Sequence, residues 1–136
     1  MEVWTPCYIA FLARAYAVAG RFEEALALFD DALQVIERTR VRWYAAEVNR
    51  HKGELLLRQG RSDAAEELYR KALSIAQEQE AKLWELRASV SLARLRRDQG
   101  RRSEARDLLA PVYGWFTEGF GTPDLKEAKA LLDELA

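Results

Sequence analysis

A single cysteine, Cys7, and a single histidine, His51, are the residues of this chain best suited to nucleophilic chemistry. An imidazole in hydrogen-bond contact with a thiol can generate the thiolate that attacks a carbonyl carbon. A sequence repeat of 40 residues places the two on neighbouring helices, one turn apart in height, which makes such a pair conceivable. We favour a structural role for both, with Cys7 filling a helix contact and His51 as a polar residue beside a groove.

Other catalytic constellations are missing from the sequence. One cysteine and one histidine exclude the usual zinc ligand sets. No G-x-x-x-x-G-K-[ST] loop is present to hold phosphates. The adjacent carboxylates at 23–24 and 66–67 lie on predicted helix surfaces, where solvation is their ordinary state. We therefore expect no catalytic residue, no cofactor and no metal, and we predict that the chain is not an enzyme.

A group of arginines in residues 94–106 is the strongest local charge in the chain. Its members are Arg94, Arg96, Arg97, Arg101, Arg102 and Arg106. Nucleic-acid binding would use such a group to contact phosphates. These arginines spread over two predicted helices and a turn without interleaved aromatic residues, and the formal net charge of the chain is -1. We therefore expect local ion pairs and no nucleic-acid partner.

The elements that position these residues follow from the 40-residue repeat. Gly20, Gly60 and Gly100 recur at this spacing. The same offset aligns three further sets, which are Ala25, Ala65 and Ala105; Leu28, Leu68 and Leu108; and Phe29, Tyr69 and Leu109. Because glycine readily adopts the left-handed backbone that ends a helix, each unit is predicted to be a helix, a glycine turn and a second helix.

The predicted elements cover nearly the whole chain. First helices are expected over 6–19, 41–59 and 82–99, and second helices over 22–38, 62–79 and 103–117. The units run over about 4–40, 41–81 and 82–120, and a capping helix covers about 122–136, within one domain spanning 1–136. Thr5 and Ser103 are predicted N-caps of their helices. The capping helix has an apolar stripe, formed by Leu125, Ala128, Leu131, Leu132 and Leu135.

The second helix of each unit resembles the tetratricopeptide repeat. The family's alternation of glycine, aromatic and alanine positions occurs as Gly20, Phe22, Ala25, Phe29 and Ala32, and in part in the next two units. The resemblance implies an all-α superhelical array of three helix pairs plus the capping helix. It also implies a concave groove, lined by the first helices, that binds peptides or partner helices.

Mapping the first helices onto that groove gives a set of charged candidates for partner binding. They are Arg14, Glu47, Arg50, Glu54, Arg58, Arg87, Arg94 and Arg97. The same mapping also puts Cys7, Ala10 and Val90 in the groove. Arginines outnumber acids, so we predict a protein or peptide ligand with exposed carboxylates, or an acidic surface. The alternative is that these arginines and glutamates pair with one another.

The C-terminal half also resembles the repeat tail of a bacterial signalling family. The residues concerned are 84–88, 91–95, 108–113 and 115–120. In that family a class III adenylate or guanylate cyclase domain precedes a P-loop ATPase module and a long repeat tail. The resemblance implies a regulatory tail in a cytoplasmic bacterial protein, whose partner can be another domain of its own chain. The alternative is an effector-sensing tail that binds a small ligand in its groove and controls an attached enzyme or DNA-binding domain.

The first helix is apolar on nearly every side. From Tyr8 to Ala19 the only charged residue is Arg14. Such helices are normally buried all round. We expect further repeats to precede it in the natural protein, and otherwise a homodimer through this helix. We expect no membrane contact, and one unpaired cysteine fits the reducing cytoplasm.

Overall fold

The computed structural model describes residues 3–136, and within them it contains seven α-helices and no strand. The predicted all-α class and helix-pair order are confirmed. The chain divides into two compact units, Met1–Ala72 and Leu73–Ala136, and the boundary falls inside the fourth helix. Each unit is a small helical stack with its own core.

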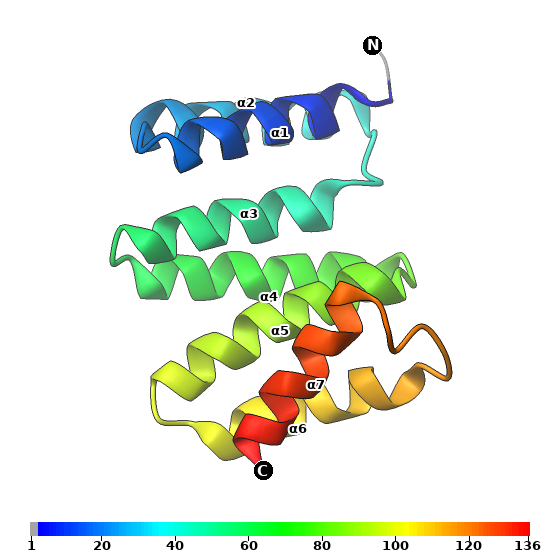
Figure 1. The fold of residues 1–136 in the computed structure, drawn as a ribbon. Helices are drawn as coiled ribbons and strands as arrows, with labels where there is room; N and C mark the ends of the chain where they lie inside the picture. Colours follow the sequence, from blue (N-terminus) through cyan, green and yellow to red (C-terminus); the bar gives the residue numbers. More distant parts are fainter. Residues whose placement is uncertain (1–2) are drawn as a thin grey trace. The chain divides into compact units, whose positions relative to one another are not determined.

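The first unit contains α1 (Thr5–Val18), α2 (Phe22–Thr39), α3 (Ala45–Arg58) and most of α4 (Ser62–Glu78). The helices α1 and α2 run side by side as a pair, and α3 packs against both (Figure 1). Alanines at the contacts let the backbones approach closely: Ala25 and Ala32 of α2 are fully buried.

The second unit contains the end of α4, then α5 (Lys82–Asp98), α6 (Arg102–Trp115) and α7 (Pro123–Leu135). The helix α7 packs against both α5 and α6 (Figure 1). Its predicted apolar stripe is confirmed, since Leu125, Ala128, Leu131 and Leu135 are buried in the core and Leu132 packs at the edge. Leu86 of α5 and Leu109 of α6 complete this core from the other side.

The glycine turns between paired helices are confirmed. Gly20 has φ +81°, and Gly60 and Gly100 both have φ +79°. At the first turn the amide of Arg21 donates to the carbonyl of Tyr16 at 2.9 Å, the bond that closes a Schellman cap. The second helices end differently, because Arg40 and Glu80 adopt the left-handed conformation without being glycine.

Three predicted helix starts are wrong. Thr5 does not cap α1, because the helix already begins at Thr5 and Trp4 holds the cap position. Ser103 lies inside α6, whose cap position is Arg101, and neither helix has a side-chain cap. The third helix starts at Ala45 and not at 41. Trp43, in the turn before it, donates from Nε1 to the carbonyl of Val3 at 2.7 Å, which holds this segment against the start of α1.

A close approach in the first unit explains one small residue of the repeat. A Cβ atom on Gly53 of α3 would lie 2.8 Å from Cε1 of Tyr69 on α4. Tyr69 is 1% exposed, so its ring has no free space into which it could move. The glycine is therefore required by packing and not by backbone conformation.

Candidate functional site

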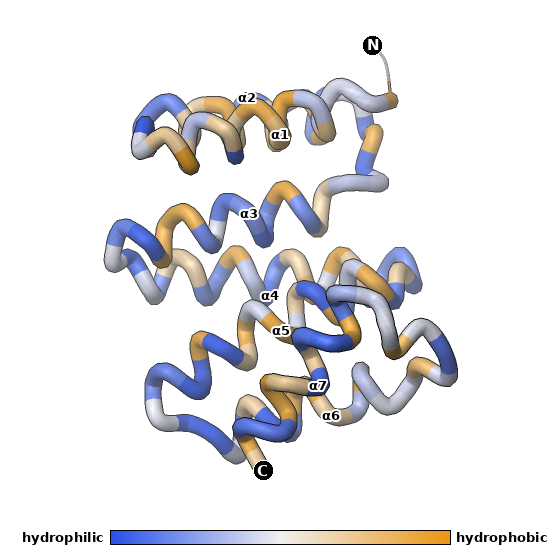
Figure 2. The backbone as a smooth tube through the Cα atoms, viewed as in Figure 1, coloured by the Kyte–Doolittle hydropathy of each residue, from blue (hydrophilic) through white to orange (hydrophobic). Residues whose placement is uncertain are grey.

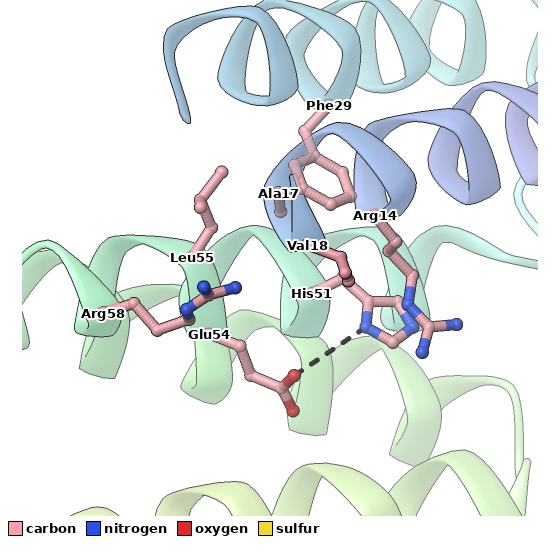
Figure 3. A pocket seen from close by; sticks show the side chains of 8 residues that line it. All are labelled: Arg14, Ala17, Val18, Phe29, His51, Glu54, Leu55 and Arg58. Carbon is pink, nitrogen blue, oxygen red and sulfur yellow. Dashed lines mark ion pairs between the residues drawn. The ribbon is translucent and has the colours of Figure 1, made fainter. Parts of the chain in front are cut away.

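A cleft of about 160 Å³ opens on the first unit (Figure 3). Its walls come from α1, α2 and α3, and its lining residues are Arg14, Ala17, Val18, Phe29, His51, Glu54, Leu55 and Arg58. Five of these eight side chains are uncharged, and the charged groups sit among them. The cleft is thus an apolar hollow with a few ionic groups.

Helical spacing brings these side chains together. On α1, Arg14 and Val18 are four residues apart and so lie one above the other on the same face. On α3, the lining residues recur at intervals of three and four from His51 to Arg58. Phe29 of α2 is 1% exposed and closes the cleft from behind.

Acidic groups in this part of α3 are held by Arg50. The guanidinium of Arg50 donates to both oxygens of Glu47, at 2.6 Å and 3.0 Å, and to Glu54 Oε1 at 2.5 Å. Glu47 is only 1% exposed, so this contact compensates a buried carboxylate. Glu54 remains partly exposed at the edge of the cleft. These contacts match the alternative in which groove residues pair with one another.

Only one of the two residues considered for nucleophilic chemistry, His51, lines the cleft. The imidazole nitrogens of His51 lie 3.8 Å from Glu47 Oε1 and 4.0 Å from Glu54 Oε2, distances beyond hydrogen bonding. Burial raises the pKa of the Cys7 thiol, which disfavours the reactive thiolate. Cys7 is buried and does not line the cleft.

Two exposed arginines flank the hollow. Figure 3 shows Arg14 and Arg58 on opposite sides of Glu54. The guanidinium of Arg58 also lies over the ring of Phe22, 5.1 Å from its centroid. Among residues 3–136, neither arginine forms an ion pair with a carboxylate. In the described part of the chain, the cleft therefore presents two arginines without an ion-pair partner next to an apolar wall, together with Glu54, which Arg50 already pairs.

The arginines of the second unit have a different environment. Three of the predicted groove residues face acids of α7. The pairs are Arg87–Asp124 at 3.0 Å, Arg94–Glu127 at 3.5 Å and Arg97–Glu134 at 2.5 Å. The first is bidentate, and the hydrogen bond to Glu134 raises the pKa of Arg97. The structure thus brings these arginines together with the capping helix.

Sequence reasoning missed part of the cleft and misplaced other residues. Phe29 and Leu55 line it although neither was assigned to the groove. The recurrence of a large residue at 29, 69 and 109 is the signal that pointed to Phe29, and it indicated only core packing. Cys7, Ala10 and Val90 were assigned to the groove but are buried.

Two further structural features bear on function. No helix in the described part of the chain is long and apolar enough to cross a lipid bilayer. Nor do residues 3–136 contain a group of three or more His, Cys, Asp and Glu side chains placed to hold a metal ion.

Comparison with known proteins identifies the repeats. Two sequence models of the tetratricopeptide repeat match the chain, one over residues 9–40 and the other over residues 44–110. No curated protein is similar enough to count as a match. The two matched segments together take up most of the chain and cover most of its paired helices, α1 with α2 and α3 to α6. The chain therefore belongs to the tetratricopeptide repeat family.

Proposed function

We propose that this chain is a protein-interaction scaffold that holds a carboxylate-bearing segment of its partner in the cleft of the first unit. Tetratricopeptide repeats are typically non-catalytic modules that bind proteins or peptides. The observation that carries the proposal is the contrast in pairing: Arg14 and Arg58 flank an apolar hollow without carboxylate partners, while the second unit's groove arginines face α7.

The chemistry of the cleft suits an acidic peptide. A guanidinium binds a carboxylate through two parallel hydrogen bonds, which fixes orientation as well as supplying energy. The neighbouring wall of Ala17, Val18 and Leu55 accepts an aliphatic side chain. We therefore expect the bound segment to carry an aspartate, a glutamate or a terminal carboxylate next to a Leu, Ile, Val or Met.

The size of the cleft favours a peptide over a small effector. Small-molecule sites commonly have volumes of about 300–1,000 Å³. A hollow of about 160 Å³ accommodates one side chain and not a whole effector. An effector-sensing tail remains the alternative function, and it predicts a ligand-induced rise in Tm that grows with effector concentration.

The wider setting is also part of the proposal. The resemblance of residues 84–120 to a bacterial cyclase–ATPase family supports a regulatory tail in a cytoplasmic signalling protein. In such a protein the acidic segment can come from another domain of the same polypeptide. Screening the attached domains for an acidic stretch next to an aliphatic residue would identify it.

Selection from a library of random displayed peptides tests the proposed site. The chain is compared with an Arg14→Glu/Arg58→Glu variant and with an Arg38→Glu/Arg106→Glu control, which changes net charge equally at exposed arginines outside the cleft. We expect acidic–aliphatic peptides to be enriched by the unmodified chain and the control. Fluorescence anisotropy should show affinity at least about tenfold weaker for the cleft variant, because charge-assisted hydrogen bonds contribute about 1.5–3 kcal/mol. Equal affinity of the cleft variant and the control would refute the site.

A further inference from the structure

The outer face of α1 is an apolar surface that the first unit leaves uncovered. We define it as Tyr8, Leu12, Ala15 and Ala19, which recur at intervals of three and four along one side of the helix. All four are exposed, Tyr8 at 61% and Leu12 at 50%. The buried residues of α1 lie on the opposite side, and they include Cys7, Ala10, Ala13 and Ala17. Figure 2 shows apolar residues along α1.

The 40-residue repeat allows this face to be compared with the equivalent face of α3, one repeat later. Forty residues on, the positions of Tyr8 and Ala15 are Val48 and Leu55 of α3, which are 0% and 2% exposed. The position of Leu12 is Lys52, whose ammonium contacts Asp30 of α2 at 2.6 Å. In α3 this face is therefore covered by a preceding helix, and α1 carries the same kind of face without a cover.

The residue at position 12 distinguishes between occupants. In α3 this position contacts the carboxylate of Asp30 through Lys52, whereas Leu12 offers only an apolar contact. Another α1 would bring leucine against leucine. The outer face contains no charged residue, so two copies meet without repulsion between like charges. We propose that the outer face of α1 binds the same face of a second copy of this chain, about a two-fold axis.

A hollow beside the outer face indicates how the two copies would fit together. It measures about 260 Å³ and is lined by Leu12, Ala15, Tyr16, Ala19 and Arg21. In an antiparallel pair of helices that cross at Leu12, Tyr8 lies as far before the crossing as Tyr16 lies beyond it. Helical side chains lean towards the N-terminus, so each Tyr8 enters the hollow between Tyr16 and Ala19 of the other copy. A two-fold axis makes this insertion occur twice.

The available area sets the strength of the contact. Aromatic side chains bury about 150–250 Å², so Tyr8 with Leu12 and its neighbours supplies about 300–400 Å² from each copy. The total of about 600–800 Å² is below the roughly 1,000 Å² that a stable, specific interface is expected to exceed. We therefore expect a weak, concentration-dependent dimer with a Kd on the order of 100 µM.

Sedimentation equilibrium between about 10 µM and about 1 mM, a range that brackets the expected Kd, measures this association. The unmodified chain should show a monomer–dimer equilibrium. Tyr8→Lys and Leu12→Lys should each weaken it at least about tenfold, because each places an ammonium in an apolar contact. Leu83→Lys is the matched control, since Leu83 is 42% exposed on α5. Circular dichroism checks that all variants remain folded.

Oxidative cross-linking tests the two-fold arrangement separately, in a Cys7→Ala background that removes the native thiol. Leu12→Cys places the two new thiols at the crossing point, where a disulfide can form. Val18→Cys is the control, because Val18 is 83% exposed but lies on the cleft side of α1. We expect Leu12→Cys to form the covalent dimer at least about tenfold faster.

Three results would overturn the inference: a monomer at every concentration, a dimer that the α1 variants leave unchanged, or equal cross-linking at the two cysteine positions. The peptide-binding proposal is tested by different residues. Arg14→Glu/Arg58→Glu should leave dimerisation intact, and Tyr8→Lys should leave peptide affinity intact, so failure of one proposal is distinguishable from failure of the other.

Discussion

The two units use the arginines of their first helices in different ways. In the second unit, Arg87 and Arg97 of α5 face carboxylates of α7. In the first unit, Arg14 and Arg58 flank a hollow whose one lining carboxylate, that of Glu54, pairs with Arg50 instead. The repeat assigns these arginines to equivalent surfaces, yet only the surface of the first unit is open. A charge at a groove position is thus available for binding only where the fold supplies no counter-charge of its own.

Pairing also occurs within the first unit, but it is local. Arg50 contacts Glu47 and Glu54, which lie within one helical turn on the same helix. In the second unit the acids come from a helix 33 to 37 residues away. The difference shows that α7 is both an apolar cap and a set of carboxylates matched to α5.

The largest effect is expected from weakening the contact between α7 and the rest of the second unit. Leu131→Ala removes a leucine that is 4% exposed in the core, and we expect a loss of about 2–5 kcal/mol in the free energy of unfolding. Leu132→Ala is the control, since Leu132 is half-buried at the edge of the same core and should cost clearly less. Urea denaturation measures both. Equal losses of unfolding free energy in the two variants would mean that Leu131 is not buried in the core more deeply than Leu132.

The next effect is alkaline destabilisation that originates in the first unit. Burial, together with the nearby Glu47, raises the pKa of Tyr44 to about 12, above its ordinary value near 10. Because the folded pKa is the higher one, the stabilisation is complete below pH 10 and is lost as the pH rises from 10 to 12. The loss should be about 2–3 kcal/mol at most. Tyr44→Phe should flatten this part of the curve of unfolding free energy against pH, and an unchanged slope would contradict the assignment.

A smaller effect comes from the close contact in the first unit. Gly53→Ala adds a methyl group against Tyr69, and overpacking of this kind costs about 1–3 kcal/mol. The helix propensity of alanine offsets about 1 kcal/mol of that cost. We expect a net loss of about 1 kcal/mol, which Tyr69→Leu in the same chain should partly relieve. A double-mutant cycle measures the coupling, and strict additivity of the two changes would argue against the contact.

The smallest effect on stability is expected from removing the carboxylates that pair with the arginines of the second unit. This change tests the difference between the two units most directly. Asp124→Asn, Glu127→Gln and Glu134→Gln together remove the carboxylates of α7 and keep its apolar stripe. Partly exposed ion pairs contribute little, so we expect a total loss of about 1 kcal/mol. The triple variant should gain a second site for acidic peptides on α5, seen as a rise in binding stoichiometry by isothermal titration calorimetry. Unchanged stoichiometry would mean that ion pairing is not what closes this surface.

Much of the fold followed from local sequence signals. The repeated glycines predicted the turns because φ near +80° strongly favours glycine, and the stripe from Leu125 to Leu135 predicted the buried face of α7. The start of α3 was not predictable in this way. It depends on Trp43, which bonds to the carbonyl of Val3, a residue 40 positions earlier.

The candidate site was harder to predict than the fold. Arg14 and Arg58 were identified by repeat register, but nothing in that register indicated that carboxylates of α7 would face the arginines of α5. Whether Asp124 meets Arg87 depends on the register between two helices with a turn and a third helix between them. Hydrophobic periodicity shows which face of a helix is buried, but it does not show how far the helix slides along its neighbour.

The contact between Gly53 and Tyr69 also limits how this array can be recombined. The corresponding pairs are Ala13 with Phe29 in the first repeat and Ala93 with Leu109 in the third. The smallest residue thus stands opposite the tyrosine, and alanine stands opposite phenylalanine and leucine. A chimera that exchanges a single helix between repeats would mismatch these partners, whereas exchange of a whole helix–turn–helix would preserve them. The unit that engineering or gene duplication can move intact is therefore the matched pair of helices and not the individual helix.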